Sequence, residues 1–131
     1  MKRYGPDTVR EVPPEFQNIY AHGVGIAKPD QLLFLSGQIG VAPDGTTPRS
    51  FEDQCRQAMD NVEALLEDAD MSLTHILRVT YYLTDARDLP ALTRIRQERW
   101  RAEEPPAVTT LVVAGLANPE LRVEIEVTAA N

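Results

Sequence analysis

A stripe of apolar residues between Ser50 and Asp70 constrains the fold more than any other feature of this chain. Apolar side chains recur there every three or four residues, as on one side of an α-helix, and most of the positions between them are polar. Ser50 followed by Asp53 is typical of a helix start, where the serine side chain accepts a backbone hydrogen bond. A helix with one apolar face has to cover another element, and we expect a β-sheet. The stripe consists of Phe51, Cys55, Ala58, Met59, Val62, Leu65, Leu66 and Ala69.

Three later segments have the composition of strands. Residues Ile76 to Thr84 are rich in β-branched and aromatic side chains, and Leu121 to Val127 alternate strictly between apolar and polar. Between them, Pro106 to Val113 form a third strand-like segment. Its Val108, Thr110 and Val112 share one face, and we expect that face to lack a helical cover and to contact another subunit.

The N-terminal part is less periodic. Residues Met1 to Asn18 contain three prolines and are expected to form an extended lead-in. The apolar segments Tyr20 to Ala27 and Leu32 to Ile39 flank the turn-like sequence Lys28-Pro29-Asp30 and predict a hairpin.

A second helix is predicted between Asp88, whose side chain we expect to cap it, and Pro105. The element order is therefore β-β-α-β-α-β-β. We predict a single α+β domain over residues 1–131, with one mixed sheet and two helices on one of its faces.

The charge of the chain argues against nucleic acid as a partner, because the formal net charge is −7. Acidic residues interrupt the one basic cluster, which is interpreted as a solvated helix face. No apolar run approaches the ~20 residues of a membrane helix, so we expect a cytoplasmic protein without a membrane partner. The basic cluster consists of Arg94, Arg96, Arg99 and Arg101.

Few residues suggest metal or thiol chemistry. The two histidines, His22 and His75, are far apart in the sequence, and with one cysteine they do not have the spacing of a metal site. Cys55 belongs to the apolar stripe and is expected in the core, while His75 is expected to be structural. His22 is either a surface residue or a titrating group beside Tyr20. We expect neither a metal nor a cofactor.

Four short motifs occur in the order and spacing of a known family. They are Gln17-Asn18-Ile19-Tyr20-Ala21-His22-Gly23, Ser36-Gly37-Gln38-Ile39, Pro106-Ala107 and Val123-Glu124-Ile125-Glu126. Together they resemble the signature of the RidA (YjgF) family of small deaminases over about a hundred residues. The resemblance implies a RidA/chorismate-mutase-like fold, a homotrimer, and small-molecule clefts between neighbouring subunits.

The resemblance also implies a chemistry, the hydrolysis of reactive imines or enamines with release of ammonia. By position, the catalytic residue is Glu124, which holds the attacking water. The family's substrate-binding positions correspond to Tyr20, Ser36, Gly37, Thr93, Val108 and Thr110. One of them departs strongly from the family pattern, because Val108 stands where an arginine normally binds the substrate carboxylate.

Two functions are compatible with this departure. The first is a deaminase-type hydrolase whose substrate choice is altered by Val108. The second is a non-catalytic ligand-binding or regulatory member of the same family. Arg78 and Arg122 are the candidates to replace the missing cation, whereas the ribonuclease activity historically attached to the family fits poorly with the acidic charge.

Overall fold

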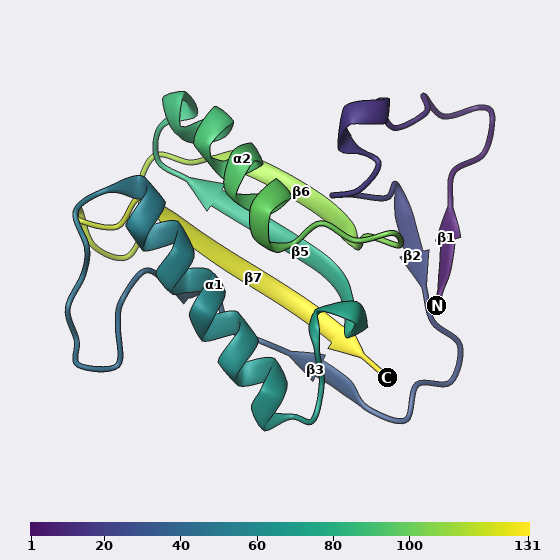
Figure 1. Cartoon of the computed structure of the whole chain (residues 1–131), viewed down its shortest axis with the longest axis horizontal. Coiled ribbons are helices and arrows are strands. Elements are labelled where there is room, and N and C mark those ends of the chain that lie inside the picture. The colour runs from purple at the N-terminus through teal and green to yellow at the C-terminus, as the bar shows by residue number, and fades with distance from the viewer.

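The computed structural model describes residues 1–131 and contains a five-stranded mixed sheet with two α-helices on one face (Figure 1). This architecture confirms the predicted α+β class. The helices are α1 (Phe51–Asp68) and α2 (Leu89–Arg99). The strands of the sheet are β3 (Leu32–Phe34), β4 (Gln38–Ile39), β5 (Ile76–Leu83), β6 (Ala107–Val112) and β7 (Val123–Ala130). Neither helix is long and apolar enough to cross a lipid bilayer.

The sheet is built around β7, the long strand at the C-terminus. Its order is β3-β7-β5-β6, with β4 paired to β7 beside β3. Strands β3, β4 and β5 are antiparallel to β7, whereas β5 and β6 are parallel because α2 connects them. This leaves β6 at one edge of the main sheet. The opposite face from the helices, here called the open face, carries no helix.

The apolar stripe of α1 packs on the inner face of this sheet as predicted, except for Leu65, which is 37% exposed. Val123, Ile125 and Val127 point from β7 into the same core, so the predicted alternation of that strand is confirmed. Cys55 is fully buried in this core, and burial raises the pKa of its thiol to about 12. The thiol therefore stays protonated at neutral pH and is a packing group.

The predicted hairpin of residues 20–27 and 32–39 is wrong. The first of these segments instead forms β2 (Gly23–Gly25), which pairs with β1 (Lys2–Tyr4) in a separate two-stranded sheet. The second is split into β3 and β4, and both pair with β7. The reason is packing, because pairing with β7 places Leu33 opposite Ala129 and against the core. The expected N-terminal lead-in thus contains a strand, and also a 3₁₀ turn at Pro14–Phe16.

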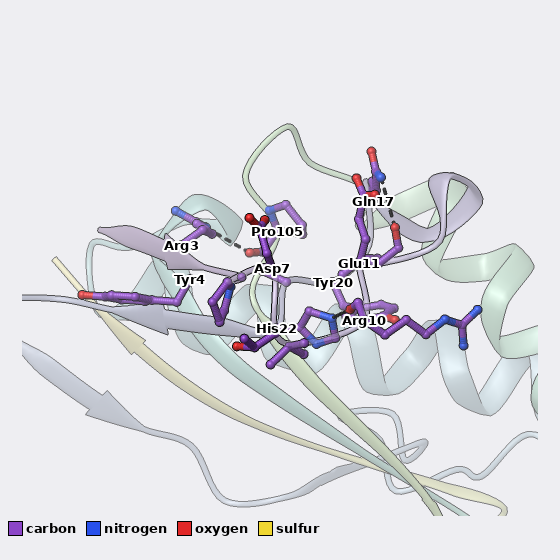
Figure 2. Close-up of a pocket in the computed structure, with 15 residues that line it drawn as sticks. Arg3, Tyr4, Asp7, Arg10, Glu11, Gln17, Tyr20, His22 and Pro105 are labelled. Carbon is purple, nitrogen blue, oxygen red and sulfur yellow. Dashed lines mark hydrogen bonds between the residues drawn. The ribbon is translucent and has the colours of Figure 1, made fainter.

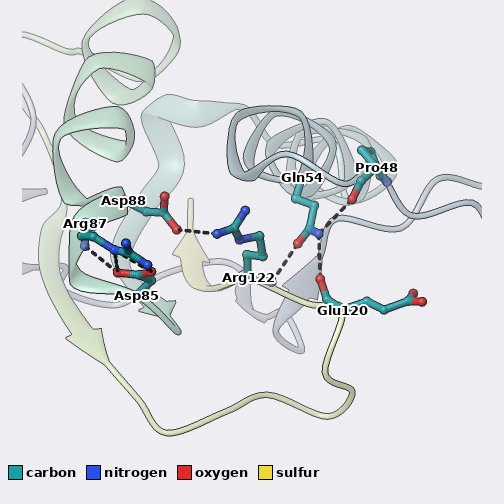
Figure 3. A network of polar contacts seen from close by, with 7 residues as sticks. All are labelled: Pro48, Gln54, Asp85, Arg87, Asp88, Glu120 and Arg122. Carbon is teal, nitrogen blue, oxygen red and sulfur yellow. Dashed lines mark hydrogen bonds and ion pairs between the residues drawn. The ribbon is translucent and has the colours of Figure 1, made fainter.

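The start of α2 also differs from the prediction. Asp88 occupies the cap position but makes no capping hydrogen bond. Asp85, three residues before Asp88, instead accepts a hydrogen bond from the backbone N–H of Arg87. Instead, the Asp88 carboxylate faces Arg122, with 3.9 Å between Oδ2 and Nη2 (Figure 3). Burial raises the pKa of the Asp88 carboxyl above its usual value.

Gln54 fixes the chain before β7 to the first turn of α1 (Figure 3). Its amide donates 2.9 Å hydrogen bonds to the carbonyls of Pro48 and Glu120, and its oxygen accepts from the backbone N–H of Arg122. The side chain is buried, so each of these bonds satisfies a group that water does not reach. Gln54 therefore ties the loop before α1 to the loop before β7.

The basic cluster on α2 is only partly solvated, and its interpretation needs a correction. Arg99 is an ion-paired surface residue that contacts Asp60 and Glu63, but Arg96 is only 7% exposed and forms no ion pair. Position 96 follows Leu92 and Ile95 on the inner side of the helix, where the 3.6-residue period turns it toward the sheet. Charge composition alone does not reveal this orientation.

Candidate functional site

Gly37 and Glu124 make the closest contact on the open face. The register places Ile39 of β4 opposite Glu124 of β7, so the Glu124 side chain extends back over residue 37. A Cβ atom added to Gly37 would lie 2.5 Å from Oε1 of Glu124. Only glycine allows this approach, and the half-buried carboxylate is therefore held beside the main chain of residues 36–37. Ser36 is exposed next to it.

Tyr82 and Glu126 extend this polar group along the open face. Tyr82 lies opposite Glu124 in the β5–β7 register, and its hydroxyl donates a 3.2 Å hydrogen bond to Oε1 of Glu126. Desolvation and this hydrogen bond raise the pKa of the Tyr82 phenol. Sequence reasoning missed Tyr82, although its position in the alternating segment 76–84 placed it on one of two faces; the register with β7 decides which one.

Thr93, Val108 and Thr110 form a second group, on the other side of the sheet. Val108 and Thr110 lie in register with Val79 and Tyr81 of β5, whose side chains point to the helices. Val108 packs against the core, and Thr93 is a half-buried residue of α2, the helix that lies on the same sheet face.

The prediction that Glu124 shares a face with Val108 and Thr110 is therefore wrong. The expectation that the face of Val108, Thr110 and Val112 lacks a cover is wrong at Val108, which packs against the core, whereas Val112 is 49% exposed. The reason is the parallel register between β5 and β6, which sets the direction of every side chain on β6. Glu124 and Val108 lie on opposite faces of one sheet, so one small ligand cannot touch both within a single chain.

Tyr20 belongs to a third place in the structure, a cavity of about 730 Å³ walled by the N-terminal segment (Figure 2). It packs edge-on against the ring of His22, with 6.0 Å between the ring centroids. His22 is exposed, and its Nε2 contacts the carbonyl oxygen of Arg10. Ala21 next to them bridges to Ala107 of β6, which brings Tyr20 to the same sheet edge as Val108.

The two arginines considered as replacements for the missing cation differ in whether their guanidinium groups are already ion-paired. Arg122 is engaged with Asp88. Arg78 is exposed, lies in register with Thr128 on the open face, and forms no ion pair. Of the two, only Arg78 has a free guanidinium on the same face as Glu124. His75, in contrast, accepts a 2.9 Å hydrogen bond from the backbone N–H of Ser72, which is a structural role.

Large apolar side chains are exposed on the open face. Phe34 is 72% exposed, Leu32 is 49% exposed and Leu111 is 45% exposed. The registers place Phe34 opposite Thr128 and Leu111 opposite Tyr82, hence on the same side as Glu124. An apolar surface of this kind around a polar group is typical of a subunit interface.

The comparisons with known proteins agree with this geometry. A family model described as Endoribonuclease L-PSP matches residues 12–131. A RutC family protein from Aquifex aeolicus is 35% identical over 96 residues, which cover 71% of this chain and 77% of the relative. A protein of Escherichia coli K12 that carries the name "Putative reactive intermediate deaminase TdcF" is 29% identical over 113 residues, 84% of each chain.

Solved structures share the fold. The Rid family protein YyfB from Yersinia pestis superposes with a TM-score of 0.85 at 23% identity, covering 99% of this chain and 98% of YyfB. RidA from an Antarctic Psychrobacter superposes with a TM-score of 0.73 at 25% identity, covering 88% of this chain and 95% of that one.

Proposed function

The chain belongs to the endoribonuclease L-PSP family, which includes the RidA-type proteins, and we propose that it is a deaminase-type hydrolase acting on a reactive imine or enamine. The observation that supports this most is the Glu124 carboxylate held over Gly37. A carboxylate held in place beside a glycine, which has no side chain, is suited to accept a hydrogen bond from a water molecule and to orient that water for attack.

The reaction that this arrangement suits is hydrolysis of a C=N bond. An enamine first tautomerises to the imine, and the oxygen of the water held by Glu124 then bonds to the imine carbon. Glu124 takes one proton from that water and returns it to the nitrogen. The remaining proton of the new hydroxyl then moves to the nitrogen, the C–N bond breaks as ammonia leaves, and a carbonyl compound remains.

The complete site is proposed to form between subunits of a homotrimer. One chain contributes Ser36, Gly37 and Glu124 from its open face, and a neighbour contributes the β6 edge with Thr93, Val108 and Thr110. Two observations support this arrangement. The two groups lie on opposite faces of each sheet, and the open face exposes apolar side chains that a neighbour would cover. In this assembly Tyr20 closes the cleft from the β6 side, where the Ala21–Ala107 bridge holds it.

The substrate is proposed to differ from that of arginine-containing relatives. A bidentate contact between arginine and carboxylate is a strong, charge-assisted interaction, and Val108 cannot make it. We therefore expect preference for an imine whose carboxylate is absent or is held by another group such as Arg78.

A non-catalytic, ligand-binding role in the same clefts is the second candidate. The packing of Val108 against the core favours it, because this position supplies neither charge nor a hydrogen bond to a substrate.

Measuring ammonia release distinguishes the two. The substrates are imines generated in situ, one series from serine and threonine by a dehydratase and one without a carboxylate from primary amines by an amine oxidase. We expect faster turnover of the uncharged series and a loss of at least about 100-fold in Glu124→Gln. The matched control is Glu126→Gln, which removes a carboxylate two residues further along the same face and should change the rate little. No acceleration of either series would favour the binding role, whereas equal losses in both variants, or no loss in Glu124→Gln, would overturn the assignment of Glu124.

A further inference from the structure

We propose that a second cavity, between α2, β5 and the N-terminal segment, binds a small organic anion with an apolar body, and that Arg96 holds its charged group. The cavity has a volume of about 550 Å³, within the range of about 300–1,000 Å³ that is common for small-molecule sites. It is separate from the proposed catalytic clefts, because neither Glu124 nor Val108 lines it.

Arg96 is a buried cation without a counter-ion. The side chain lies in the cavity wall and is 7% exposed, and no carboxylate lies within 4.0 Å of its nitrogens. Its guanidinium carbon is 4.9 Å from the centre of the Tyr81 ring, and Nη2 donates a 2.9 Å hydrogen bond to the carbonyl of Ile19. Buried charges in proteins are generally paired, because removing a charge from water costs several kcal/mol. A planar guanidinium with free donors matches a carboxylate.

The neighbouring groups do not neutralise this charge. The Tyr81 hydroxyl is fully buried, and burial raises the pKa of the phenol, so Tyr81 stays neutral at physiological pH. Among the other charged groups in the wall, Arg3 pairs with Glu104, and Arg101, Glu103 and Glu104 are exposed to water. Arg96 is therefore the one buried charge in the cavity wall, and it has no counter-ion.

Trp100 supplies an independent observation. Its side chain lies in the same wall, and its indole nitrogen is buried without a hydrogen-bond acceptor. Buried donors are rarely left unpaired in native proteins, and an anionic oxygen is the acceptor that both Trp100 and Arg96 lack. The other buried residues of the wall include Ile19, Ile76 and Val79 and are apolar, whereas its remaining polar and charged residues are at least partly exposed. These two properties specify the ligand class, which is a carboxylate on a small aromatic or branched aliphatic body.

The single tryptophan of the chain makes this proposal testable, because its indole N–H gives one resonance in a nitrogen-15 correlation spectrum. We choose phenylacetate as the anionic probe and phenylacetamide as its neutral counterpart of almost the same shape. Phenylacetate should shift the Trp100 resonance in a saturable way, and phenylacetamide should bind at least about tenfold more weakly. No saturable shift with phenylacetate, or equal binding of the two probes, would overturn the proposal.

Two arginine variants test whether Arg96 is the residue that binds the carboxylate of phenylacetate. Arg96→Met keeps an unbranched apolar stem but removes the guanidinium, and it should weaken phenylacetate binding at least about tenfold. Arg94→Met is the matched control, because Arg94 is an exposed arginine on the same helix, and it should bind as the parent protein does. Unchanged binding in Arg96→Met would refute the role of Arg96. If that variant does not fold, the comparison of the two probes on the parent protein still decides. Glu124→Gln should leave this binding unchanged, which separates this test from that of the proposed hydrolase.

Discussion

The two regions of the molecule that are proposed to bind small molecules differ in how much of each a single chain builds. The open face holds Glu124 over Gly37, but the β6 edge with Val108 points to the other side of the sheet. The cavity under α2 is bounded by one chain alone, and it already contains the charged group that would bind a ligand, Arg96.

The two regions also differ from expectation in where charged and apolar residues lie. At the sheet edge, where the family resemblance leads one to expect an arginine, position 108 is an apolar residue packed against the core. On α2, where a solvated surface was expected, an arginine is buried against an aromatic ring. Each residue type is opposite to the expectation for its place, and the predictions that follow test whether the two regions work independently.

The largest effect should come from breaking the proposed trimer. Phe34 is the most exposed large apolar side chain on the open face, so Phe34→Lys places a charge where a neighbouring subunit would pack. We expect light scattering to show a threefold fall in mass, and ammonia release to be lost. Binding of phenylacetate under α2 should persist, because that cavity is built by one chain.

The control for this change is Leu65→Lys, which alters an exposed leucine on the outer side of α1. It should leave the mass unchanged. A parent protein that is monomeric at micromolar concentration would contradict the trimer directly.

Substitutions at two glycines should distinguish an effect on the geometry of the candidate site from an effect on stability. A Cβ at Gly37 would meet the flexible end of the Glu124 side chain, whereas a Cβ at Gly40 would lie 2.5 Å from Cα and 2.7 Å from the carbonyl oxygen of Gln54 in α1. Gly37→Ala should therefore displace the carboxylate, lowering turnover at least about tenfold with less than about 1 kcal/mol lost in stability. Gly40→Ala should cost about 1–3 kcal/mol because backbone has to move.

Urea unfolding and ammonia release, measured on both glycine variants, check this separation. A Gly37→Ala protein with full turnover would show that the position of Glu124 over Gly37 is unimportant. In that case the assignment of Glu124 as the water-orienting residue would be abandoned.

Much of the fold was predictable because it depends on local periodicity. The apolar stripe of α1 and the alternation of β7 each specify one buried face, and both predictions are confirmed apart from the exposed Leu65. The hairpin failed because residues 20–27 and 32–39 find partners far away in sequence, in β1 and β7. Pairing over such separations is not encoded in any short window.

For the candidate site, the sequence resemblance selected residues but not their arrangement. The resemblance selected Glu124 and Gly37, and the structure brings them together. The face of Val108 depends on the parallel register with β5, where a shift of one residue reverses every side chain. Arg96 was missed because its burial depends on α2 docking on Tyr81. The signal available in the sequence was its position directly after the apolar Ile95 on the inner side of the helix.

An arginine placed at position 108 of β6 should increase activity at the proposed catalytic site without affecting the cavity under α2. Val108→Arg is expected to raise kcat/KM at least about tenfold for imines derived from serine or threonine, because it adds a charge-assisted contact to the substrate carboxylate. The matched control is Thr109→Arg, which places the same charge on the open face of the same strand and should give no comparable gain. A folded, trimeric Val108→Arg protein without any gain would point to the binding role.

The smallest expected effect concerns the stability contributed by Arg96. Replacing an unpaired buried cation by an unbranched apolar residue relieves its desolvation, which offsets the loss of the hydrogen bond to Ile19 and of the contact with Tyr81. Arg96→Met should therefore change the free energy of unfolding by less than about 1 kcal/mol. Arg99→Met should cost more, because Arg99 loses ion pairs with Asp60 and Glu63 and a 3.0 Å hydrogen bond to the carbonyl of Arg56.

Urea unfolding followed by Trp100 fluorescence compares the two arginine variants under one set of conditions. A residue that binds a ligand is not optimised for stability, so near-neutral stability together with lost phenylacetate binding is the combination that we expect for Arg96→Met. A loss well above that of Arg99→Met would instead identify Arg96 as a structural cation that holds α2 on the sheet. The cavity would then lose the feature that distinguishes it from an ordinary packing defect.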